Sequence, residues 1–137
     1  VRRIMGRLWN KVILDSAINP VSAILKVTNG CLMHRAESRN LMRKLVEEGC
    51  AVAASHGIDL ITPDLWEELA QMCDRSSDTI SPMLQDVLNE HATEIEAQCG
   101  MICRYGREHG IGTPTHEIFV DLIKMVEEWR PDGERYC

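Results

Sequence analysis

The first part of the chain carries apolar residues at the spacing of an amphipathic helix. They recur at about every fourth position, close to the helical period, which predicts a helix over residues 4–18. The side chains expected on its buried side are Ile4, Leu8, Val12, Ile13 and Ala17. More apolar residues follow Pro20 up to residue 25, and Thr28, Asn29 and Gly30 then form a sequence typical of a turn.

A longer amphipathic run covers residues 37–56. The apolar side chains that we expect to face the core are Leu41, Leu45, Val52 and Ala53. Gly57 follows directly, and glycine readily adopts the left-handed conformation that ends many helices. The pattern therefore predicts a second long helix that stops at Gly57.

Proline marks the start of three further helices. Each proline follows a hydroxyl residue that can cap the helix, and proline fits the first helical position because the N–H there has no partner within the helix. The three pairs are Thr62-Pro63, Ser81-Pro82 and Thr113-Pro114. The last pair predicts a helix from residue 114 to about Trp129, closed by residues 130–133.

A fourth start has the form of a capping box, in which the side chains of Thr93 and Glu96 each accept the other's backbone N–H. We expect the helix that it opens to run through Cys103 and to end at His109 and Gly110. No segment alternates polar and apolar residues as a half-buried strand does. The chain is therefore predicted to be a single all-α domain over residues 1–137, with six or seven helices.

Composition and charge exclude several classes of protein. With 45% hydrophobic and 26% charged residues the chain has the composition of a globular protein, and it shows neither a membrane-spanning stretch nor a secretion signal. The net charge of −6 disfavours a nucleic-acid-binding surface. We expect a cytoplasmic protein with no membrane and no nucleic-acid partner, and, since the first residue is Val1, a part of a longer protein.

The cysteines are even in number, which is compatible with disulfides, but the absence of a secretory signal favours reduced thiols. They are Cys31, Cys50, Cys73, Cys99, Cys103 and Cys137. Cys99 and Cys103 would share one face of a helix and could bind a metal. No further ligands stand at a recognisable spacing, so we expect no metal site.

The first predicted helix carries three polar residues at steps of four. Lys11, Asp15 and Asn19 fall within an arc of about 80° and a length of about 12 Å. Two other interpretations stay open, an ordinary surface ion pair and a helix break at Asn19 and Pro20. Glu94 is a second candidate, either as a carboxylate facing a cleft or as an acidic residue in a first helical turn, where the helix dipole favours it.

Several short motifs follow one another over about residues 9–128. In the first half they are Trp9-Asn10-Lys11-Val12-Ile13, Ile18-Asn19-Pro20, Ala23-Ile24 and Asn29-Gly30. In the second half they are Ser81-Pro82-Met83-Leu84-Gln85-Asp86, His91-Ala92-Thr93-Glu94-Ile95, Gly100, His109-Gly110-Ile111 and Thr113-Pro114. In this order and at these separations they resemble the C-terminal helical domain of the ketopantoate reductase family.

The resemblance implies a domain that closes over the substrate of an NADPH-dependent reductase of 2-dehydropantoate, on the way to pantothenate and coenzyme A. A separate N-terminal Rossmann domain would bind the NADPH. Lys11 corresponds to the family's catalytic lysine, which polarises the ketone and donates a proton. Asn19 and Asn29 correspond to asparagines that orient the substrate. Glu94 corresponds to a catalytic glutamate beside the reacting groups, which can pair with the lysine and contact the substrate or the nicotinamide ribose. The expected partners are the keto acid, the Rossmann domain and, in a homodimer, a second copy.

The chain departs from the family pattern at two substrate positions. Asp15 stands where the family has asparagine one turn after the lysine, and its carboxylate would repel an anionic keto acid. Pro82 replaces a serine whose hydroxyl holds the substrate, which leaves Ser81 as the nearby replacement. These departures favour, as an alternative, a related 2-keto acid reductase of altered specificity. A non-catalytic helical dimerisation domain is the alternative from another class. Since the chain has no G-x-G-x-x-G motif, we expect it to be inactive by itself.

Overall fold

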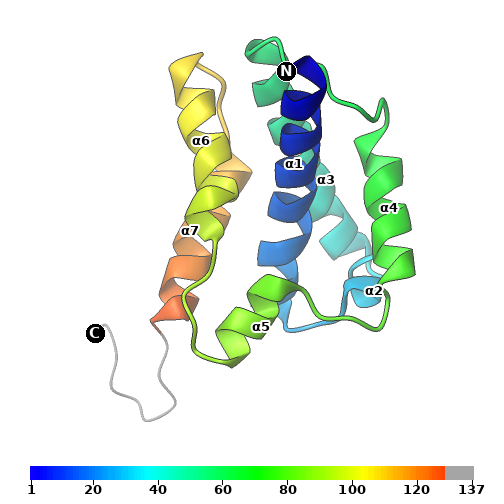
Figure 1. Cartoon of the computed structure of the whole chain (residues 1–137). Helices are drawn as coiled ribbons and strands as arrows, with labels where there is room; N and C mark the ends of the chain where they lie inside the picture. The colour runs from blue at the N-terminus through cyan, green and yellow to red at the C-terminus, as the bar shows by residue number, and fades with distance from the viewer. Residues whose placement is uncertain (129–137) are drawn as a thin grey trace.

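The structure, a computed structural model, describes residues 1–128 and is helical over that range (Figure 1). Its elements are α1 (Arg2–Leu25), α2 (Asn29–Leu32), α3 (Ala36–Ser55), α4 (Leu65–Arg75), α5 (Pro82–Leu88), the 3-10 helix η1 (Ile95–Ala97), α6 (Cys99–Glu108) and α7 (Pro114–Glu127). The described residues contain no strand, which confirms the predicted all-α class with six or seven helices. α1 runs through the middle of the molecule, between α4 on one side and α6 with α7 on the other, and packs against α3, α5 and α7.

In its first half, α1 buries a different face from the one predicted. Ile4 and Leu8 are 70% and 50% exposed, whereas Trp9 is 2% exposed. The segment after α3 packs so closely on α1 that a Cβ at Gly6 would collide with the backbone oxygen of Asp59. The buried face therefore passes through Gly6 and Trp9, and the prediction for Ile4 and Leu8 is wrong.

Pro20 lies inside α1 without ending it. Proline has no N–H to donate to the carbonyl four residues earlier, which here belongs to Ser16. The buried thiol of Cys99 on α6 donates to this oxygen instead, with Sγ 3.5 Å away. The helix continues to residue 25, so the alternative of a break at Asn19 and Pro20 is wrong.

The expected turn at residues 28–30 is the entry into α2, for which Thr28 is the N-terminal cap position. Gly30 packs against Ser77 so closely that a Cβ would lie 2.6 Å from the Ser77 Cβ, and its N–H donates to the Ser77 oxygen at 3.0 Å. α3 matches its prediction, because Gly57 follows it with a φ of 68°. Of its predicted core side chains, Leu41 is only partly buried, while the others are buried: Leu45, Val52 and Ala53.

The first two proline starts have different outcomes. Ser81 caps α5 as predicted, since its Oγ accepts the backbone N–H three residues later at 3.1 Å and Pro82 takes the first helical position. Pro63 does not begin a helix. α4 starts at Leu65, because the Asp64 carboxylate accepts a backbone N–H of the first turn at 3.1 Å.

The third start, at Pro114 of α7, is correct, but its capping group was not predicted. The Thr113 hydroxyl makes no capping hydrogen bond. Glu48 of α3 caps the helix instead, accepting the backbone N–H groups of Thr115 at 2.8 Å and His116 at 3.1 Å. A carboxylate far away in the sequence thus satisfies the first turn of α7.

The capping box predicted at Thr93 and Glu96 does not form. Glu96 pairs with Lys124 of α7, and the N–H and hydroxyl of Thr93 donate to the Glu127 carboxylate at 2.6 and 2.8 Å. Residues 95–97 consequently form only the short η1, and α6 begins at Cys99. α6 ends at residue 108, close to its predicted end.

The predicted end of the last helix near Trp129 and the closing turn at residues 130–133 lie outside the described residues. Within residues 1–128, none of the helices combines the length and apolar character needed to cross a membrane. The cysteines in this range are free thiols, as predicted: Cys31, Cys50, Cys73, Cys99 and Cys103.

Candidate active site

Lys11 and Asp15 form an ion pair on the open side of α1. The Lys11 Nζ lies 2.7 Å from an Asp15 carboxylate oxygen, and the two side chains are 75% and 23% exposed. The hydrogen bond and the charge of Asp15 raise the pKa of Lys11, and the charge of Glu94 adds to this, against a smaller opposing effect of burial. Lys11 is therefore an ammonium at neutral pH that a small molecule can reach from solvent.

A groove of about 350 Å³ lies beside this pair, between α1 and α4 with the segment that precedes α4. The other residues that line it are Arg7, Asn10, Leu14, Ile61, Thr62, Glu68 and Met72. Asn10 is held by its amide Nδ2, which donates to Glu68 at 2.9 Å and to Thr62 at 3.3 Å. Charges of both signs thus face an apolar wall, a combination suited to a small polar molecule with an apolar part.

Glu94 lies close enough to Lys11 for its charge to act on the ammonium. Its side chain is exposed, and it stands just before η1. Among residues 1–128, no hydrogen bond or ion pair joins Glu94 to Lys11. The charge of Glu94 therefore raises the pKa of Lys11, but the two side chains make no direct contact.

Asn19 is buried and links α1 to the segment that carries Glu94. Its Nδ2 donates to Oε1 of Gln98 at 3.3 Å, and the Gln98 backbone N–H donates to the carbonyl of Glu94 at 3.1 Å. Gln98 is itself 8% exposed. Nothing in the spacing of the sequence singled out Gln98, although it holds two candidate residues in place.

Asn29 has one polar atom without a partner. Its Nδ2 donates to the Ser76 hydroxyl at 3.1 Å, and its backbone N–H donates to the Thr79 carbonyl at 2.9 Å. Its Oδ1 is buried and accepts no hydrogen bond from any described residue. A buried acceptor left unpaired costs about 1–3 kcal/mol. Asn29 is not among the residues that line the groove beside Lys11.

The hydroxyl of Ser81 is already engaged in the fold. It is 1% exposed, accepts the Leu84 N–H at 3.1 Å and shares a short hydrogen bond with the Ser22 hydroxyl of α1. The neighbouring Pro82 is exposed. At this position the chain therefore presents a proline ring to solvent and keeps its serine inside.

One buried cluster of polar side chains escaped prediction. The Nε2 of the His116 ring shares a hydrogen bond with Ser16 Oγ at 3.2 Å. The Nδ1 of the same ring donates to the Glu48 carboxylate at 2.7 Å. Ser16 and His116 are both 0% exposed, so this serine cannot reach a substrate. The cluster instead ties together α1, α3 and α7, and no spacing in the sequence relates its three members.

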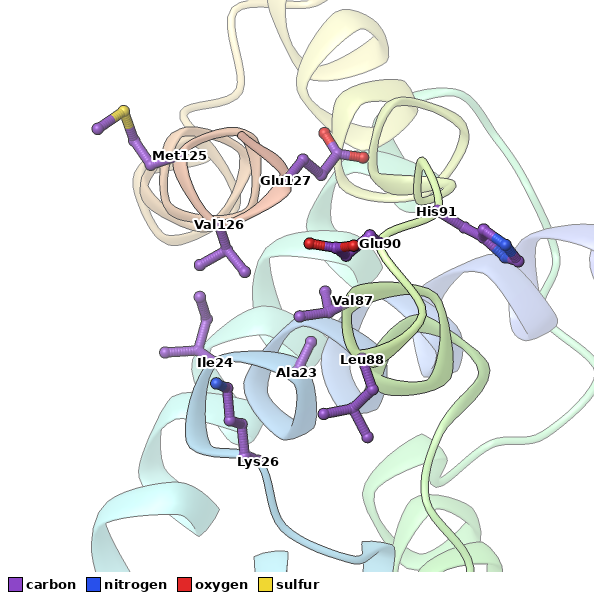
Figure 2. A pocket seen from close by; sticks show the side chains of 10 residues that line it. All are labelled: Ala23, Ile24, Lys26, Val87, Leu88, Glu90, His91, Met125, Val126 and Glu127. Atoms are coloured by element: carbon purple, nitrogen blue, oxygen red, sulfur yellow. The ribbon is translucent and has the colours of Figure 1, made fainter. Parts of the chain in front are cut away.

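A further hollow, of about 490 Å³, lies away from Lys11, between the ends of α1, α5 and α7 (Figure 2). Figure 2 shows Ile24, Val87 and Val126 facing one another across it, while the ring of His91 points away. Neither Lys11 nor Glu94 lines this hollow. The candidate active site is therefore the Lys11 side of α1.

Comparisons with known proteins show the family to which the chain belongs. Residues 3–127 match the family model described as the C terminal of ketopantoate reductase PanE/ApbA. The 2-dehydropantoate 2-reductase of Pyrococcus horikoshii is 34% identical over 125 residues, which cover 90% of this chain and 41% of that protein. The crystal structure of a PanE/ApbA family ketopantoate reductase from Ralstonia eutropha JMP134 has a TM-score of 0.84 and 30% identity, over 89% of this chain and 41% of that one.

Two other solved structures are similar at 26% identity and a TM-score of 0.80. One is D-mandelate dehydrogenase in a ternary structure with NADH and anilino(oxo)acetate, matched over 88% of this chain and 40% of that one. The other is a dimeric ketopantoate reductase from Staphylococcus aureus, matched over 90% and 43%. The chain thus spans about two fifths of the length of its relatives. It belongs to the ketopantoate reductase family and corresponds to the C-terminal domain of these oxidoreductases.

Proposed function

We propose that the protein containing this chain is an NADPH-dependent 2-dehydropantoate 2-reductase in which Lys11 is the general acid. The observation that carries the proposal is the exposed Lys11 ammonium, held by Asp15 at 2.7 Å beside a groove and within the field of Glu94. The similarity to 2-dehydropantoate 2-reductases over nearly the whole chain supports the same activity.

The reaction needs a cation at the ketone oxygen. NADPH, when bound, supplies the hydride that adds to the ketone carbon. Lys11 Nζ donates a hydrogen bond to the ketone oxygen, stabilises the negative charge that builds there and transfers a proton to it. Asp15 keeps the lysine protonated until that transfer.

Most of the contacts to NADPH would come from another part of the protein. The described residues form no sheet, and the chain has no G-x-G-x-x-G turn to hold the phosphates of a dinucleotide. Glu94 is the residue that we assign to the nicotinamide ribose, because its carboxylate is exposed beside Lys11. A ribose hydroxyl can donate a hydrogen bond to this carboxylate.

Neither predicted asparagine lines the groove beside Lys11. We retain Asn29 as a predicted substrate contact, which would require its buried Oδ1 to become accessible. Asn19 is committed to Gln98, so we assign it mainly to the positioning of Glu94. We retain Ser81 as a predicted substrate contact, which would require its hydroxyl to give up a bond to Ser22 or to the α5 backbone.

The exposed apolar side chains of α1 supply a surface for the cofactor-binding half. Ile4 and Leu8 are exposed, and together with Lys11 and Asp15 they fall within an arc of about 60° around the helix at 100° per residue. Exposed apolar side chains on the same side of the helix as the candidate catalytic residues are typical of a surface that another domain covers. We propose that the Rossmann domain docks here and closes the groove around the substrate.

A related 2-keto acid reductase of altered specificity is the second candidate, and Asp15 favours it. The Asp15 carboxylate lines the groove and would repel an anionic substrate unless Lys11 neutralises it. The exposed Pro82 also offers no hydroxyl at its position. The structural similarity to a D-mandelate dehydrogenase is compatible with such a change of substrate.

The test is a steady-state assay of the full-length protein with NADPH and a panel of 2-keto acids, followed by the loss of absorbance of the reduced cofactor. We expect the highest kcat/KM with 2-dehydropantoate. A clear preference for another 2-keto acid would replace the first candidate with the second. No reduction of any keto acid would contradict both and favour an association domain.

A further inference from the structure

Arg7 is a second cation in the lining of the groove beside Lys11. It stands four residues before Lys11 on α1, so the two side chains are neighbours on the helix, with Cβ atoms about 5–6 Å apart. Arg7 is exposed, and among residues 1–128 no acidic side chain lies within ion-pair distance of it. Its guanidinium is therefore a cation that no carboxylate of the described residues neutralises by direct contact.

The two carboxylates of the groove lining are engaged elsewhere. Asp15 pairs with Lys11 at 2.7 Å, and an oxygen of Glu68 accepts a hydrogen bond from the Asn10 amide at 2.9 Å. Lys11 is thus paired and Arg7 is not, although both line the same groove. Because Asp15 offsets much of the positive charge of Lys11, an anionic group in the groove is attracted most strongly by Arg7.

The helix places Arg7 on the side of Lys11 that faces the apolar wall of the groove. At 100° per residue, Arg7 falls between Lys11 and the buried Leu14 of the lining, whereas Asp15 falls on the other side of Lys11. Along the helix axis, Arg7 and Asp15 lie about 6 Å from Lys11 in opposite directions. A ligand at Lys11 therefore has its negative charge drawn towards Arg7 and repelled from Asp15.

We propose that Arg7 binds the carboxylate of a 2-keto acid whose ketone oxygen accepts a hydrogen bond from Lys11. A planar guanidinium donates two parallel hydrogen bonds to a carboxylate, which a lysine cannot do. In a 2-keto acid the carboxylate and the ketone stand on adjacent carbons, so one ligand of this class can reach two cations that are one helical turn apart. The carboxylate then points away from Asp15, and Arg7 offsets the repulsion from that residue. The inference rests on the function proposed above, whose assignment of Lys11 it extends.

The test is the binding of a 2-keto acid and of its uncharged ester to the full-length protein in excess NADP⁺. The probes are 2-oxoisovalerate and its methyl ester, and the oxidised cofactor prevents their reduction during isothermal titration. The wild type is expected to bind the acid about 10-fold or more tightly than the ester. Arg7→Gln should weaken binding of the acid by about 10-fold or more and leave binding of the ester unchanged, since only the acid carries the charge.

Two further variants show whether the effect belongs to the guanidinium. Arg7→Lys keeps the charge without the bidentate geometry, so it should recover part of the affinity for the acid. Arg3→Gln is the matched control, because Arg3 is exposed one turn earlier on α1 and does not line the groove. It should bind the acid like the wild type. The affinity for NADP⁺, titrated separately, should be the same in all variants.

The possible outcomes separate this inference from the proposed function. An Arg7→Gln variant that binds the acid like the wild type, or that loses affinity for acid and ester alike, would overturn the role of Arg7. A wild type that does not prefer the acid would do the same, and so would a variant that loses affinity for NADP⁺ instead, which would assign Arg7 to a cofactor phosphate. A wild type that binds the acid through Arg7 but does not reduce it when NADPH replaces NADP⁺ would reject the proposed function alone.

Discussion

At the scale of single residues, Asp15 raises the pKa of Lys11. The Asp15 hydrogen bond and charge are the main causes of the raised pKa of Lys11, and its carboxylate faces the groove where an anionic substrate would bind. The same side chain therefore stabilises the ammonium and opposes the keto acid. These two effects can be separated by one substitution.

Asp15→Asn in the full-length protein should change both properties. Loss of the carboxylate lowers the pKa of Lys11, so the alkaline limb of the pH–rate profile should move to lower pH. The KM for the keto acid should fall severalfold, because a like charge is removed from the groove. Initial rates measured across pH and substrate concentration test both effects. Asp121→Asn, an exposed carboxylate on α7, is the control. An unchanged KM together with an unchanged alkaline limb would refute this role of Asp15.

The sequence predicted the Lys11 and Asp15 pair because the interaction is local, four residues apart on one helix. It did not predict the partners of Asn19 and His116, since Gln98 is 79 residues from Asn19 and Ser16 is 100 residues from His116. Local spacing contains no information about contacts between distant helices. The roles of Lys11 and Glu94 came from family resemblance, and the structure adds that their charges interact.

At the scale of helices, the carboxylate of Glu48 fixes the start of α7. It accepts two backbone N–H groups of the first turn and a hydrogen bond from the His116 ring. Burial alone raises the pKa of Glu48, but the hydrogen bonds from His116 and Thr115 outweigh it, and the pKa lies below its ordinary value. Glu48 is therefore a charged cap inside the helical bundle.

Glu48→Gln should lower the free energy of unfolding by about 1.5–3 kcal/mol, the range for a hydrogen bond to a charged group. Because folding depresses the Glu48 pKa, its contribution is present above the unfolded pKa, near 4.5, and is lost as pH falls through the folded value. The wild type should thus lose stability below about pH 4.5 more steeply than the variant. Urea unfolding at neutral and acidic pH measures this. Glu47→Gln, an exposed neighbour, should unfold like the wild type, and equal pH dependence in Glu48→Gln would disprove the role.

Helix boundaries were predictable where the capping group lies next to the helix it caps. Ser81 capped α5 as expected. The start of α4 shifted because the nearby Asp64 competes with Thr62 as a cap. The box at Thr93 failed because α7, remote in sequence, offers Glu127 and Lys124 as partners. Local capping rules thus fail where a tertiary partner is stronger.

At the scale of the whole molecule, the all-α class followed from the helical period and the absence of strand patterns. The orientation of α1 did not, because the buried face near its start is set by the loop at Asp59, and Ile4 and Leu8 face outward. These exposed side chains lie in line with Lys11, where we propose that the cofactor-binding half docks. On this proposal, the chain contributes one wall of the active site.

The 137-residue chain alone should show no turnover and no tight binding of NADPH, since it has no G-x-G-x-x-G motif and its described residues form no sheet. Isothermal titration with NADPH and an assay with 2-dehydropantoate test this. The full-length protein at the same concentration is the positive control. NADPH-dependent reduction by the isolated chain would show that the second half is not needed.

The most direct test of the account is the rate of the full-length protein with Lys11→Ala. Loss of the ammonium should lower kcat by about 100-fold or more, because the charge that it stabilises peaks in the transition state. Lys124→Ala, which removes a lysine that also pairs with a glutamate, should keep the wild-type rate. A Lys11→Ala enzyme with nearly normal kcat would contradict the assignment of Lys11 as the general acid.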